Sequence, residues 1–371
     1  MNDVDVKFMR LALREARKGL GRTSPNPAVG AVIARGDEVV ARGYHRRVGL
    51  AHAEVEALKR LENASPHDTL YVTLEPCNHT GKTPPCTLAI LEKGIKRVVV
   101  GMKDPNPSVR GGGSDFLKEH GVEVVTGVLE PECRRLNEDF LLFVALGRPF
   151  VISKSALTLD GWIATSSGHS QWITNPKSRQ FVHRLRDRVD AVMVGIGTIL
   201  ADDPSLTTRL KRGRGRDPLR VIVDTRLRTP DHAKVVTEGT PERTLLVAGD
   251  DTDPGLMDRF RVRGIPILQC PVKDGRIDLS FLMNRLGEMS VMSLLLEGGG
   301  TLTGSMLREG LIDKFYIFKA PKLLGGGDGI PMAAGPGAKK MGQCLVLKQI
   351  RVRRFGDDIL IRGYPGYHHS P

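Results

Sequence analysis

Four side chains in the first quarter of the sequence can bind a metal ion and move a proton. They are His52 and Glu54, in the stretch AHAEVEAL, and Cys77 and Cys86, in the stretch EPCNHTGKTPPC. Zinc prefers cysteine thiolate and histidine nitrogen in a tetrahedral set, and catalytic zinc sites leave one position to water. The ion lowers the pKa of that water to about 7. The pattern therefore predicts a hydrolytic zinc site in which Glu54 moves the proton.

The order of these residues is typical of zinc deaminases. His-x-Glu followed by Pro-Cys and a second Cys occurs in enzymes that replace the amino group of a nucleobase by attack of an activated water. Residues two apart point to nearly opposite sides of a regular helix, so we expect His52 and Glu54 at an irregular first turn. An alternative is a structural zinc site with four protein ligands, in which His79 would be the fourth. Structural sites, however, generally use tighter Cys-x2–4-Cys spacing and give Glu54 no role.

The elements around these stretches must bring the four side chains together. Apolar residues at helical spacing predict a helix in DVKFMRLALREARKG, and two short strands flank the turn at Gly36-Asp37. We expect further helices in AEVEALKRLENA, PCTLAILEKG and PECRRLNEDFLLFVAL, and strands in TLYVTLEP, IKRVVVGMKDP and GVEVVTGV. This alternation predicts helices packed on a mostly parallel sheet, with the metal ligands near helix N-termini.

A second α/β series follows a break at Gly147-Arg148-Pro149, which we take as the boundary between two domains. It ends in a strand pair, CLVLKQIRVRRFG and DDILIRGY. The stretch LLLEGGGTLTGSML predicts a strand, a glycine turn and a helix, an arrangement that lets backbone N–H groups approach a phosphate. A plain strand-to-helix turn has the same pattern, so phosphate binding stays open on this evidence alone.

Length and composition limit the class of protein. A chain of 371 residues suits two domains, and 26% charged with 40% hydrophobic residues indicates a globular protein. The formal charge of +13 favours phosphate-bearing ligands, whether nucleic acid or small molecule. No apolar run approaches the roughly 20 residues of a membrane helix, and the charged N-terminal stretch has no signal-peptide core. Five cysteines favour thiols or metal ligands over disulfides, so we expect a cytoplasmic protein.

Longer stretches carry a family resemblance. TSPNPAVGAVI, HAE and EPCNHTGKTPPC resemble the bifunctional riboflavin-biosynthesis deaminase/reductase family of bacteria, and SKSALTLDGWIAT, SQWIT and GIGTILADDPSLTTR resemble its reductase half. Nucleic-acid and cytidine deaminases usually carry Pro-Cys-x-x-Cys, whereas eight residues separate Cys77 from Cys86 here. This insert and the absence of interleaved basic and aromatic residues count against the alternative, a tRNA-editing deaminase with a C-terminal binding domain.

The resemblance implies an α/β fold in both halves. Residues 1–147 would form a cytidine-deaminase-like α/β/α layer domain, and residues 148–366 a dihydrofolate-reductase-like domain. The first would use zinc hydroxide to deaminate 2,5-diamino-6-(5-phosphoribosylamino)pyrimidin-4-one. The second would use NADPH to reduce the ribosyl group of the product to ribityl. The implied partner is therefore a phosphorylated pyrimidine rather than a nucleic acid or a membrane, and the implied assembly is a homodimer or homotetramer.

The resemblance also assigns residues to each pocket. In the deaminase half, it implies Glu54 as the catalytic residue and His52, Cys77 and Cys86 as zinc ligands. The implied substrate contacts there are Asn26, His45, His79 and Lys82. The implied substrate contacts of the reductase half are Ser170, Arg186, Leu206, Arg209 and Glu297. Its implied NADPH contacts are Ala156, Trp172, Thr198, Asp202, Gly299, Gly300, Thr301, Leu302, Thr303, Gly304 and Ser305.

Some residues of the reductase half have a second candidate role or a purely structural alternative. Lys154 is a candidate for proton transfer, and a 2′-phosphate of the cofactor could be met by Lys154, Arg186 or Lys322. Taken singly, an arginine more often forms a surface salt bridge, and Trp172 would be a core or lid residue.

Overall fold

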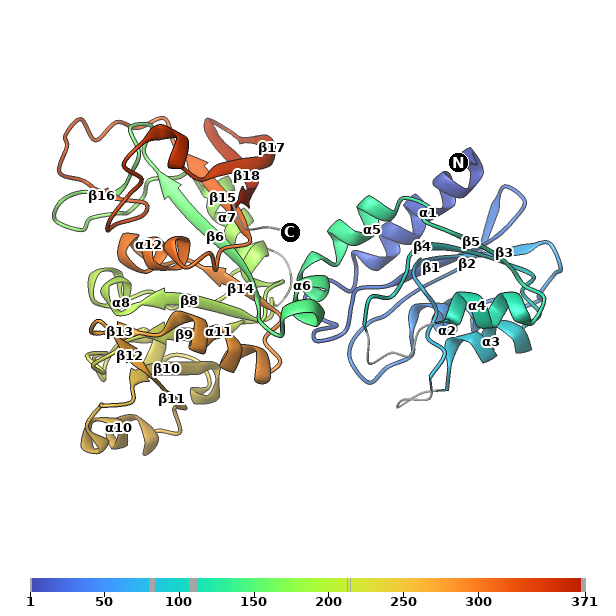
Figure 1. Ribbon diagram of the computed structural model, residues 1–371, viewed down its shortest axis with the longest axis horizontal. Coiled ribbons are helices and arrows are strands. Elements are labelled where there is room, and N and C mark those ends of the chain that lie inside the picture. Colours follow the sequence, from blue (N-terminus) through green and yellow to red (C-terminus); the bar gives the residue numbers. More distant parts are fainter. Residues whose placement is uncertain (1, 80–83, 107–111, 212, 214, 368–371) are drawn as a thin grey trace. The chain divides into compact units, whose positions relative to one another are not determined.

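The computed structural model describes residues 2–79, 84–106, 112–211, 213 and 215–367. The chain divides into two compact units, unit 1 over Met1–Gly147 and unit 2 over Arg148–Pro371 (Figure 1). Within the described ranges, no helix is both long enough and apolar enough to span a bilayer.

Unit 1 is a five-stranded sheet with helices on both faces (Figure 1). The strand order is β2 (Glu38–Tyr44), β1 (Gly30–Arg35), β3 (Asp68–Leu74), β4 (Arg97–Met102) and β5 (Glu123–Thr126). β3, β4 and β5 are parallel, whereas β1 runs antiparallel to both of its neighbours. The predicted mostly parallel sheet therefore contains one reversed strand, which the tight hairpin at Gly36 produces; Gly36 has a φ of 57°, in the left-handed region.

In the part of unit 1 that the structure describes, six helices cover this sheet. They are α1 (Asp3–Ala16), α2 (Ala53–Leu58), α3 (Cys86–Glu92), α4 (Gly113–Glu119), α5 (Glu130–Leu136) and α6 (Glu138–Leu146). Figure 1 shows α1 and α5 on one face and α2, α3 and α4 on the other. The contact between α2 and the sheet is very close, because a Cβ on Gly43 of β2 would lie 2.3 Å from the carbonyl oxygen of Ala53. That contact determines where the start of α2, and with it His52, lies.

The predicted single helix at the end of unit 1 is wrong. The stretch PECRRLNEDFLLFVAL forms two helices, α5 and α6, which are separated at Asn137. The buried side chain of Asn137 accepts a hydrogen bond from the backbone N–H of Ala28 at 2.8 Å and donates to the carbonyl oxygen of Ala28 at 3.1 Å. An asparagine side chain that binds a distant backbone in this way holds its residue outside helical geometry. The short helix α4 was not predicted.

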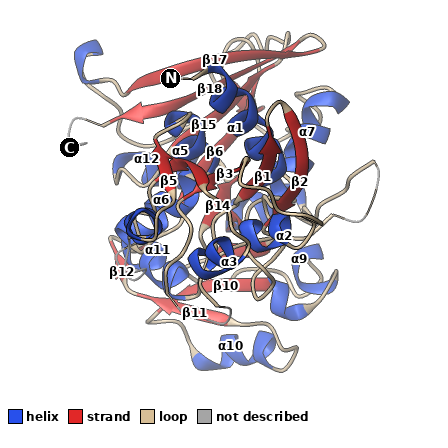
Figure 2. Cartoon of the chain, turned by 90° about the vertical axis from the view of Figure 1, so that its right-hand side faces the viewer, coloured by secondary structure: helices blue, strands red, loops and turns tan. Residues whose placement is uncertain are grey.

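Unit 2 is built on a nine-stranded sheet. The order is β11 (Ile267–Cys270), β10 (Thr244–Gly249), β9 (Leu219–Val223), β8 (Ala191–Gly195), β14 (Ser293–Leu296), β6 (Phe150–Leu157), β15 (Lys314–Lys319), β18 (Asp358–Gly366) and β17 (Val346–Phe355). The run from β11 to β15 is parallel. The last two strands are antiparallel and form the long pair at the outer end of the sheet (Figure 2).

Shorter elements complete unit 2. Two small antiparallel pairs join β7 (Trp162–Ala164) with β16 (Ile330–Pro331) and β12 (Val272–Lys273) with β13 (Arg276–Ile277). The helices are α7 (Pro176–Arg186), α8 (Ile196–Asp202), α9 (Lys234–Thr237), α10 (Pro254–Arg261), α11 (Leu279–Glu288) and α12 (Gly300–Arg308), with 3-10 turns at Pro241–Arg243 and Met341–Gln343. The expected series of strands from FVISKSALTLDG to DDILIRGY is present, but the prediction did not include β11, α9, α10, α11 or the two small pairs.

Both faces of the unit 2 sheet are covered. Ala191 and Met193 of β8 belong to a buried cluster with residues of α11 and α12, whereas Val192 and Val194 belong to a second cluster with residues of α8 and α10. Parallel sheets that are buried on both faces carry such continuous apolar strands. Because the faces are occupied by helices, the exposed carboxyl edge of the parallel strands is where a ligand site is expected.

Candidate functional sites

Three ligand atoms meet in unit 1. His52 is the residue that precedes α2, Cys77 lies in the loop after β3, and Cys86 is the first residue of α3. The Nδ1 atom of His52 lies 3.2 Å from the sulfur of Cys86 and 3.5 Å from that of Cys77, and the two sulfurs are 3.3 Å apart. Zinc bonds of ordinary length would give N–S and S–S separations of about 3.6 and 3.8 Å, so the three atoms suit one tetrahedral ion.

The loop between the two cysteines is fastened to the start of α3. The backbone N–H of Cys86 donates to the sulfur of Cys77 at 3.4 Å, and that of Thr87 donates to the carbonyl oxygen of Cys77 at 3.3 Å. The hydroxyl of Thr87 donates to Asn78 at 2.8 Å. The neighbouring Cys86 thiol and the His52 ring lower the pKa of Cys77, which favours the thiolate that a metal needs.

Glu75 holds the strand end before Cys77, a role that the sequence analysis missed. Its carboxylate accepts hydrogen bonds from the backbone N–H groups of Ser114, at 2.9 Å, and Asp104, at 3.2 Å. Its own N–H donates to Met102 at 2.9 Å. These bonds tie the end of β3 to the end of β4 and to α4. An acidic residue directly before Pro76-Cys77 was the only signal for it in the sequence.

Glu54 lies in the first turn of α2 with its side chain enclosed. The residue is 3% exposed, and its Oε2 atom has no hydrogen-bond partner in the part of the chain that the structure describes. Burial raises the pKa of Glu54 to about 7, although the charge of His52 acts in the opposite direction. A buried carboxyl oxygen without a partner is rare in a protein, and it fits a site that an ion and a water molecule complete. The donor set and this orphaned oxygen together fit zinc.

Two of the expected deaminase substrate contacts form a hydrogen-bonded pair beside the ligands. Nδ1 of His45 donates to the carbonyl oxygen of Ala51 at 3.2 Å, which leaves Nε2 to accept from the amide of Asn26 at 3.3 Å. The His45 ring stands edge-on to that of His52, with centroids 5.5 Å apart. Burial lowers the pKa of His45, so the ring stays neutral and keeps its acceptor.

The structure does not place the other two expected substrate contacts, His79 and Lys82, beside the metal ligands. His79 is exposed, and among the described residues the metal-binding group contains His52, Cys77 and Cys86 but not His79. The alternative of a closed structural site with His79 as fourth ligand therefore gains no support. Lys82 lies outside the described residues.

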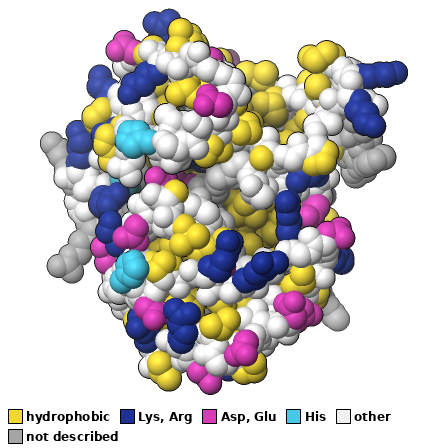
Figure 3. All heavy atoms as spheres, turned by 90° about the vertical axis from the view of Figure 1, so that its left-hand side faces the viewer, with side chains coloured by type: hydrophobic (Ala, Val, Ile, Leu, Met, Phe, Trp, Pro, Cys, Tyr) yellow, Lys and Arg dark blue, Asp and Glu magenta, His cyan; other side chains and the backbone are white. Residues whose placement is uncertain are grey.

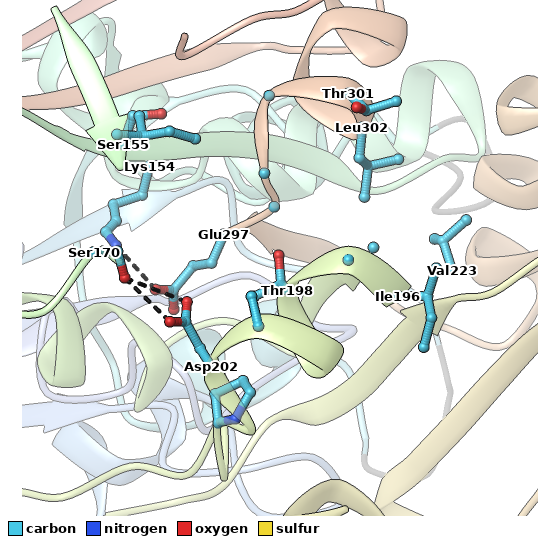
Figure 4. Close-up of a pocket in the computed structure, with 18 of the residues that line it drawn as sticks. Lys154, Ser155, Ser170, Ile196, Thr198, Asp202, Val223, Glu297, Thr301 and Leu302 are labelled. Carbon is cyan, nitrogen blue, oxygen red and sulfur yellow. Dashed lines mark hydrogen bonds and ion pairs between the residues drawn. The ribbon is translucent and has the colours of Figure 1, made fainter. Parts of the chain in front are cut away.

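Unit 2 contains a cleft of ≈ 1570 Å³ at the carboxyl ends of β6, β14, β8 and β9 (Figures 3 and 4). Fifteen of the residues assigned to the reductase half line it, namely Lys154, Ala156, Ser170, Trp172, Arg186, Thr198, Asp202, Leu206, Arg209, Glu297, Gly299, Gly300, Thr301, Leu302 and Ser305. Thr303 and Gly304 do not. Thr303 is 1% exposed, and a Cβ on Gly304 would lie 2.0 Å from the carbonyl oxygen of Ala334, so both positions on α12 face its packing side.

Glu297 follows β14 and pairs with two cations. Its Oε1 accepts from Nε of Arg186 at 2.6 Å and its Oε2 from Nζ of Lys154 at 3.1 Å. Burial by itself raises the pKa of Glu297, but the charges of Arg186 and Lys154 outweigh it and lower the pKa to about 2. The carboxylate is therefore ionised and binds both cations, although its single negative charge balances only one of their two positive charges. That pairing counts against a 2′-phosphate contact for Lys154 or Arg186, and Lys322 instead donates to the carbonyl oxygen of Trp172 at 2.5 Å.

Further polar contacts join the predicted residues to one another. The hydroxyl of Ser170 donates to the carboxylate of Asp202, at 3.2 Å to one oxygen and 3.4 Å to the other. Trp172 is 58% exposed, and the Arg179 guanidinium lies over its ring at 4.4 Å from the centroid. Trp172 is therefore at the rim of the cleft and not in the core.

His183 also lines the cleft and was not predicted. It lies three residues before Arg186 on α7, so both side chains lie on one side of the helix. Its Nδ1 accepts from the backbone N–H of Arg209 at 3.3 Å. Burial first, and then the charges of Arg186 and Arg209, lower the pKa of His183 to about 4. This helical spacing was the signal that could have revealed it.

The two glycines at the start of α12 have different surroundings. A Cβ on Gly300 would lie 2.4 Å from the carbonyl oxygen of Pro331, so packing requires glycine there. A Cβ on Gly299 would meet only the hydroxyl oxygen of Thr198, at 3.8 Å. No side chain caps the N-terminus of α12. Gly299 thus opens onto the cleft beside free backbone donors, which suits a phosphate of a dinucleotide.

The chain is similar to known proteins over nearly its whole length. It matches the cytidine and deoxycytidylate deaminase zinc-binding region over residues 2–102 and the RibD C-terminal domain over residues 149–361. Riboflavin biosynthesis protein RibD of Actinobacillus pleuropneumoniae is 42% identical over 96% of this chain and 94% of that protein. RibD of Aquifex aeolicus is 40% identical over 97% of this chain and 98% of that protein.

Solved structures agree with these matches. Acinetobacter baumannii RibD superposes with a TM-score of 0.86 at 36% identity and covers 98% of this chain and 99% of that one. A diaminohydroxyphosphoribosylaminopyrimidine deaminase/5-amino-6-(5-phosphoribosylamino)uracil reductase from Thermotoga maritima has the same TM-score of 0.86, at 36% identity and the same coverage. The predicted α/β fold class of both halves is thereby confirmed.

Proposed function

The chain belongs to the RibD family of riboflavin-biosynthesis proteins, and on that premise we propose how its residues divide the work of the two activities. It is a bifunctional enzyme, a zinc-dependent deaminase and a reductase. Unit 1 carries the deaminase site and unit 2 the reductase site. The alternative of a tRNA-editing deaminase is not favoured, because the relatives match both units.

The substrate follows from the name of the Thermotoga relative. A diaminopyrimidine that bears a phosphoribosylamino group loses its ring amino group in unit 1, and the resulting uracil derivative is reduced in unit 2. The observation that carries the deaminase half is the group of three ligand atoms within 4.8 Å of one another beside the buried Glu54.

In unit 1, His52, Cys77 and Cys86 would hold the zinc ion. When bound, zinc supplies Lewis acidity that makes a water molecule acidic near neutral pH. Glu54 takes a proton from the attacking water at Oε2 and passes it to the leaving amino group. With a pKa of about 7, the carboxyl can both hold and release that proton. We assign the Asn26–His45 pair, which lies beside His52, to orienting the pyrimidine.

In unit 2, the cleft orders two ligands. NADPH, when bound, supplies the hydride, and its pyrophosphate would lie at Gly299 and the N-terminus of α12. Glu297 accepts hydrogen bonds from the sugar hydroxyls, and Lys154 holds or protonates the sugar oxygen as the ring opens. Among the described residues, none forms a hydrogen bond or an ion pair with the guanidinium of Arg209. We assign this group to the substrate phosphate.

We also propose a cellular compartment and an oligomeric state for this enzyme. We place the enzyme in the cytoplasm, a location that suits the five free cysteines. The resemblance predicts a homodimer or homotetramer, which light scattering of the purified protein would measure.

The test replaces Glu54 by glutamine and measures ammonia release from the diaminopyrimidine phosphate. Removal of the proton carrier should slow release by about 10²- to 10⁴-fold, with zinc content unchanged. NADPH consumption on the deaminated intermediate should stay at the wild-type rate. Glu56→Gln is the matched control, because Glu56 lies on the same helix and pairs with Arg46 and Arg60 at its outer side. Ammonia release at the wild-type rate in Glu54→Gln would refute the assignment.

A further inference from the structure

Among the described residues, ten lysine and arginine side chains line the cleft of unit 2, and eight of them have partners. Lys154 and Arg186 bind Glu297, Lys234 binds Asp203, Lys273 binds Asp278, Arg228 lies 3.9 Å from Asp224, Arg276 donates to Ser305, and Arg179 and Arg308 donate to backbone carbonyls. In the described part of the chain, the guanidinium groups of the other two, Arg209 and Arg226, have neither a hydrogen bond nor an ion pair. Within the described ranges, these two guanidinium groups are therefore free to contact a ligand in the cleft.

The two arginines lie toward different ends of the cleft. The charge of Arg209 acts on His183 together with that of Arg186, which binds Glu297 at the end of β14. Arg226 follows the end of β9 by three residues. The sheet order β9-β8-β14-β6 puts β9 three strands from β6, a span of about 14 Å at the usual strand spacing. Figure 4 shows Lys154 and Ser155 on one side of the cleft and Ile196 and Val223 on the other.

This strand order determines the direction of the cofactor, if unit 2 is the reductase proposed above. The reacting nicotinamide must lie beside Lys154 and Glu297, where the sugar is reduced. The pyrophosphate lies at Gly299, directly after β14. An extended dinucleotide that starts at β6 and crosses β14 must therefore place its adenosine over β8 and β9, where Arg226 lies.

The loop that carries Arg226 is held rigidly. Leu227 is 2% exposed and has a φ of 48°, which is uncommon for a residue other than glycine. The carboxylate of the buried Asp224 accepts from the backbone N–H of Thr229 at 2.7 Å and from its hydroxyl at 2.8 Å. The carbonyl oxygen of Thr225 accepts from Gly249 at 3.0 Å and Thr252 at 3.2 Å. A fixed loop lowers the entropic cost of binding through the side chain that it presents.

We propose that Arg226 binds the 2′-phosphate of the cofactor and sets the preference of this enzyme for NADPH over NADH. The guanidinium offers two parallel N–H donors to phosphate oxygens, and the 2′-phosphate is the only group that distinguishes the two dinucleotides. This inference rests on the proposed reductase function. It replaces the expectation that Lys154, Arg186 or Lys322 reads this phosphate.

The test measures binding to the full chain, without turnover. Dissociation constants of 2′,5′-ADP and of 5′-AMP are determined by calorimetry for wild type, Arg226→Gln and Arg259→Gln. Loss of a charge-assisted contact should weaken 2′,5′-ADP binding about tenfold in Arg226→Gln and leave 5′-AMP binding unchanged. Arg259 pairs with Asp231 outside the cleft lining, so its variant removes the same charge and should bind both nucleotides as wild type does.

Two further variants keep the outcome decisive. Arg226→Lys retains the charge without the fork and should lose part of the affinity for 2′,5′-ADP; it serves as the test if thermal unfolding shows that the glutamine variant is misfolded. The proposal is overturned if the ratio of the two dissociation constants is unchanged in the Arg226 variants, or if Arg228→Gln loses the discrimination in their place. A wild-type chain that binds both nucleotides equally also overturns it. A wild-type chain that does not bind NADPH at all refutes the reductase function itself.

Discussion

The two sites of this enzyme are built on opposite plans. The metal ligands and the acid of unit 1 lie within residues 52–86, and they meet because two helix N-termini and one loop converge. The cleft of unit 2 takes its residues from the ends of four strands that are far apart in the sequence. A metal needs a few atoms at fixed distances, whereas a dinucleotide and a sugar phosphate need a long surface with balanced charge. Loss of one ligand atom should therefore abolish the activity of unit 1. Loss of one contact in unit 2 should only reduce its activity or its affinity for a ligand.

Loss of one sulfur should have the largest effect. Cys86→Ser removes a thiolate from a site with three protein ligands, so zinc content should fall from about one ion per chain to almost none, and ammonia release should cease. Metal analysis of the purified protein gives the readout. Cys133→Ser is the control, because Cys133 is buried in the same unit but lies outside the metal-binding group. Full zinc content in Cys86→Ser would show that the site is held by other atoms.

Loss of one charge in unit 2 should be severe but incomplete. Glu297→Gln keeps the shape of the side chain and leaves Lys154 and Arg186 without a counter-charge. We expect the free energy of unfolding of unit 2 to fall by about 3 kcal/mol and the reductase kcat/KM by about 10²-fold. Glu288→Gln, which alters only an exposed pair with Arg285, should change neither. Unchanged reduction kinetics in Glu297→Gln would remove Glu297 from the substrate site.

The two glycines before and in α12 should separate packing from binding. Gly300→Ala places a methyl group against the carbonyl oxygen of Pro331, so the melting temperature of unit 2 should fall. Gly299→Ala has room in the fold, and its melting temperature should stay as in wild type while NADPH affinity falls about tenfold. Calorimetric binding and thermal unfolding of both variants measure this. Wild-type NADPH affinity in Gly299→Ala would mean that the cofactor does not approach this turn.

Titration of His183 should give the smallest effect. Its pKa is lowered from 6.5 to about 4 in the folded chain, so between these values the unfolded chain binds a proton that the folded chain does not. The free energy of unfolding of unit 2 should therefore fall as the pH falls from 6.5 to 4. Urea unfolding at several pH values should show that this free energy decreases less steeply in His183→Gln than in wild type. His232→Gln, at an exposed position, should behave as wild type does. An equally steep decrease in His183→Gln would contradict this assignment.

The sequence predicted the site of unit 1 better than that of unit 2, because the residues of the first site are close together in the sequence and those of the second are not. The zinc ligands and Glu54 were found because their spacing is local and their chemistry is specific. The break at Asn137 was not, because its partner Ala28 lies 109 residues away. In unit 2 most strands were found, but their order was not. Thr303 and Gly304 were grouped with their neighbours, although the helical period of α12 turns them toward the packing side.

The amino-acid sequence by itself determined the chemistry of the deaminase site and the α/β class of both halves, because residue type, spacing and periodicity are local properties. Only the tertiary structure decided which charges stay free. Lys154 and Arg186 were candidates from the sequence, but their shared pairing with Glu297 appeared only in the structure, and Arg226 had no signal at all. Whether a charge is neutralised depends on which strand ends lie side by side, and pairing between distant strands is a property of the whole sheet.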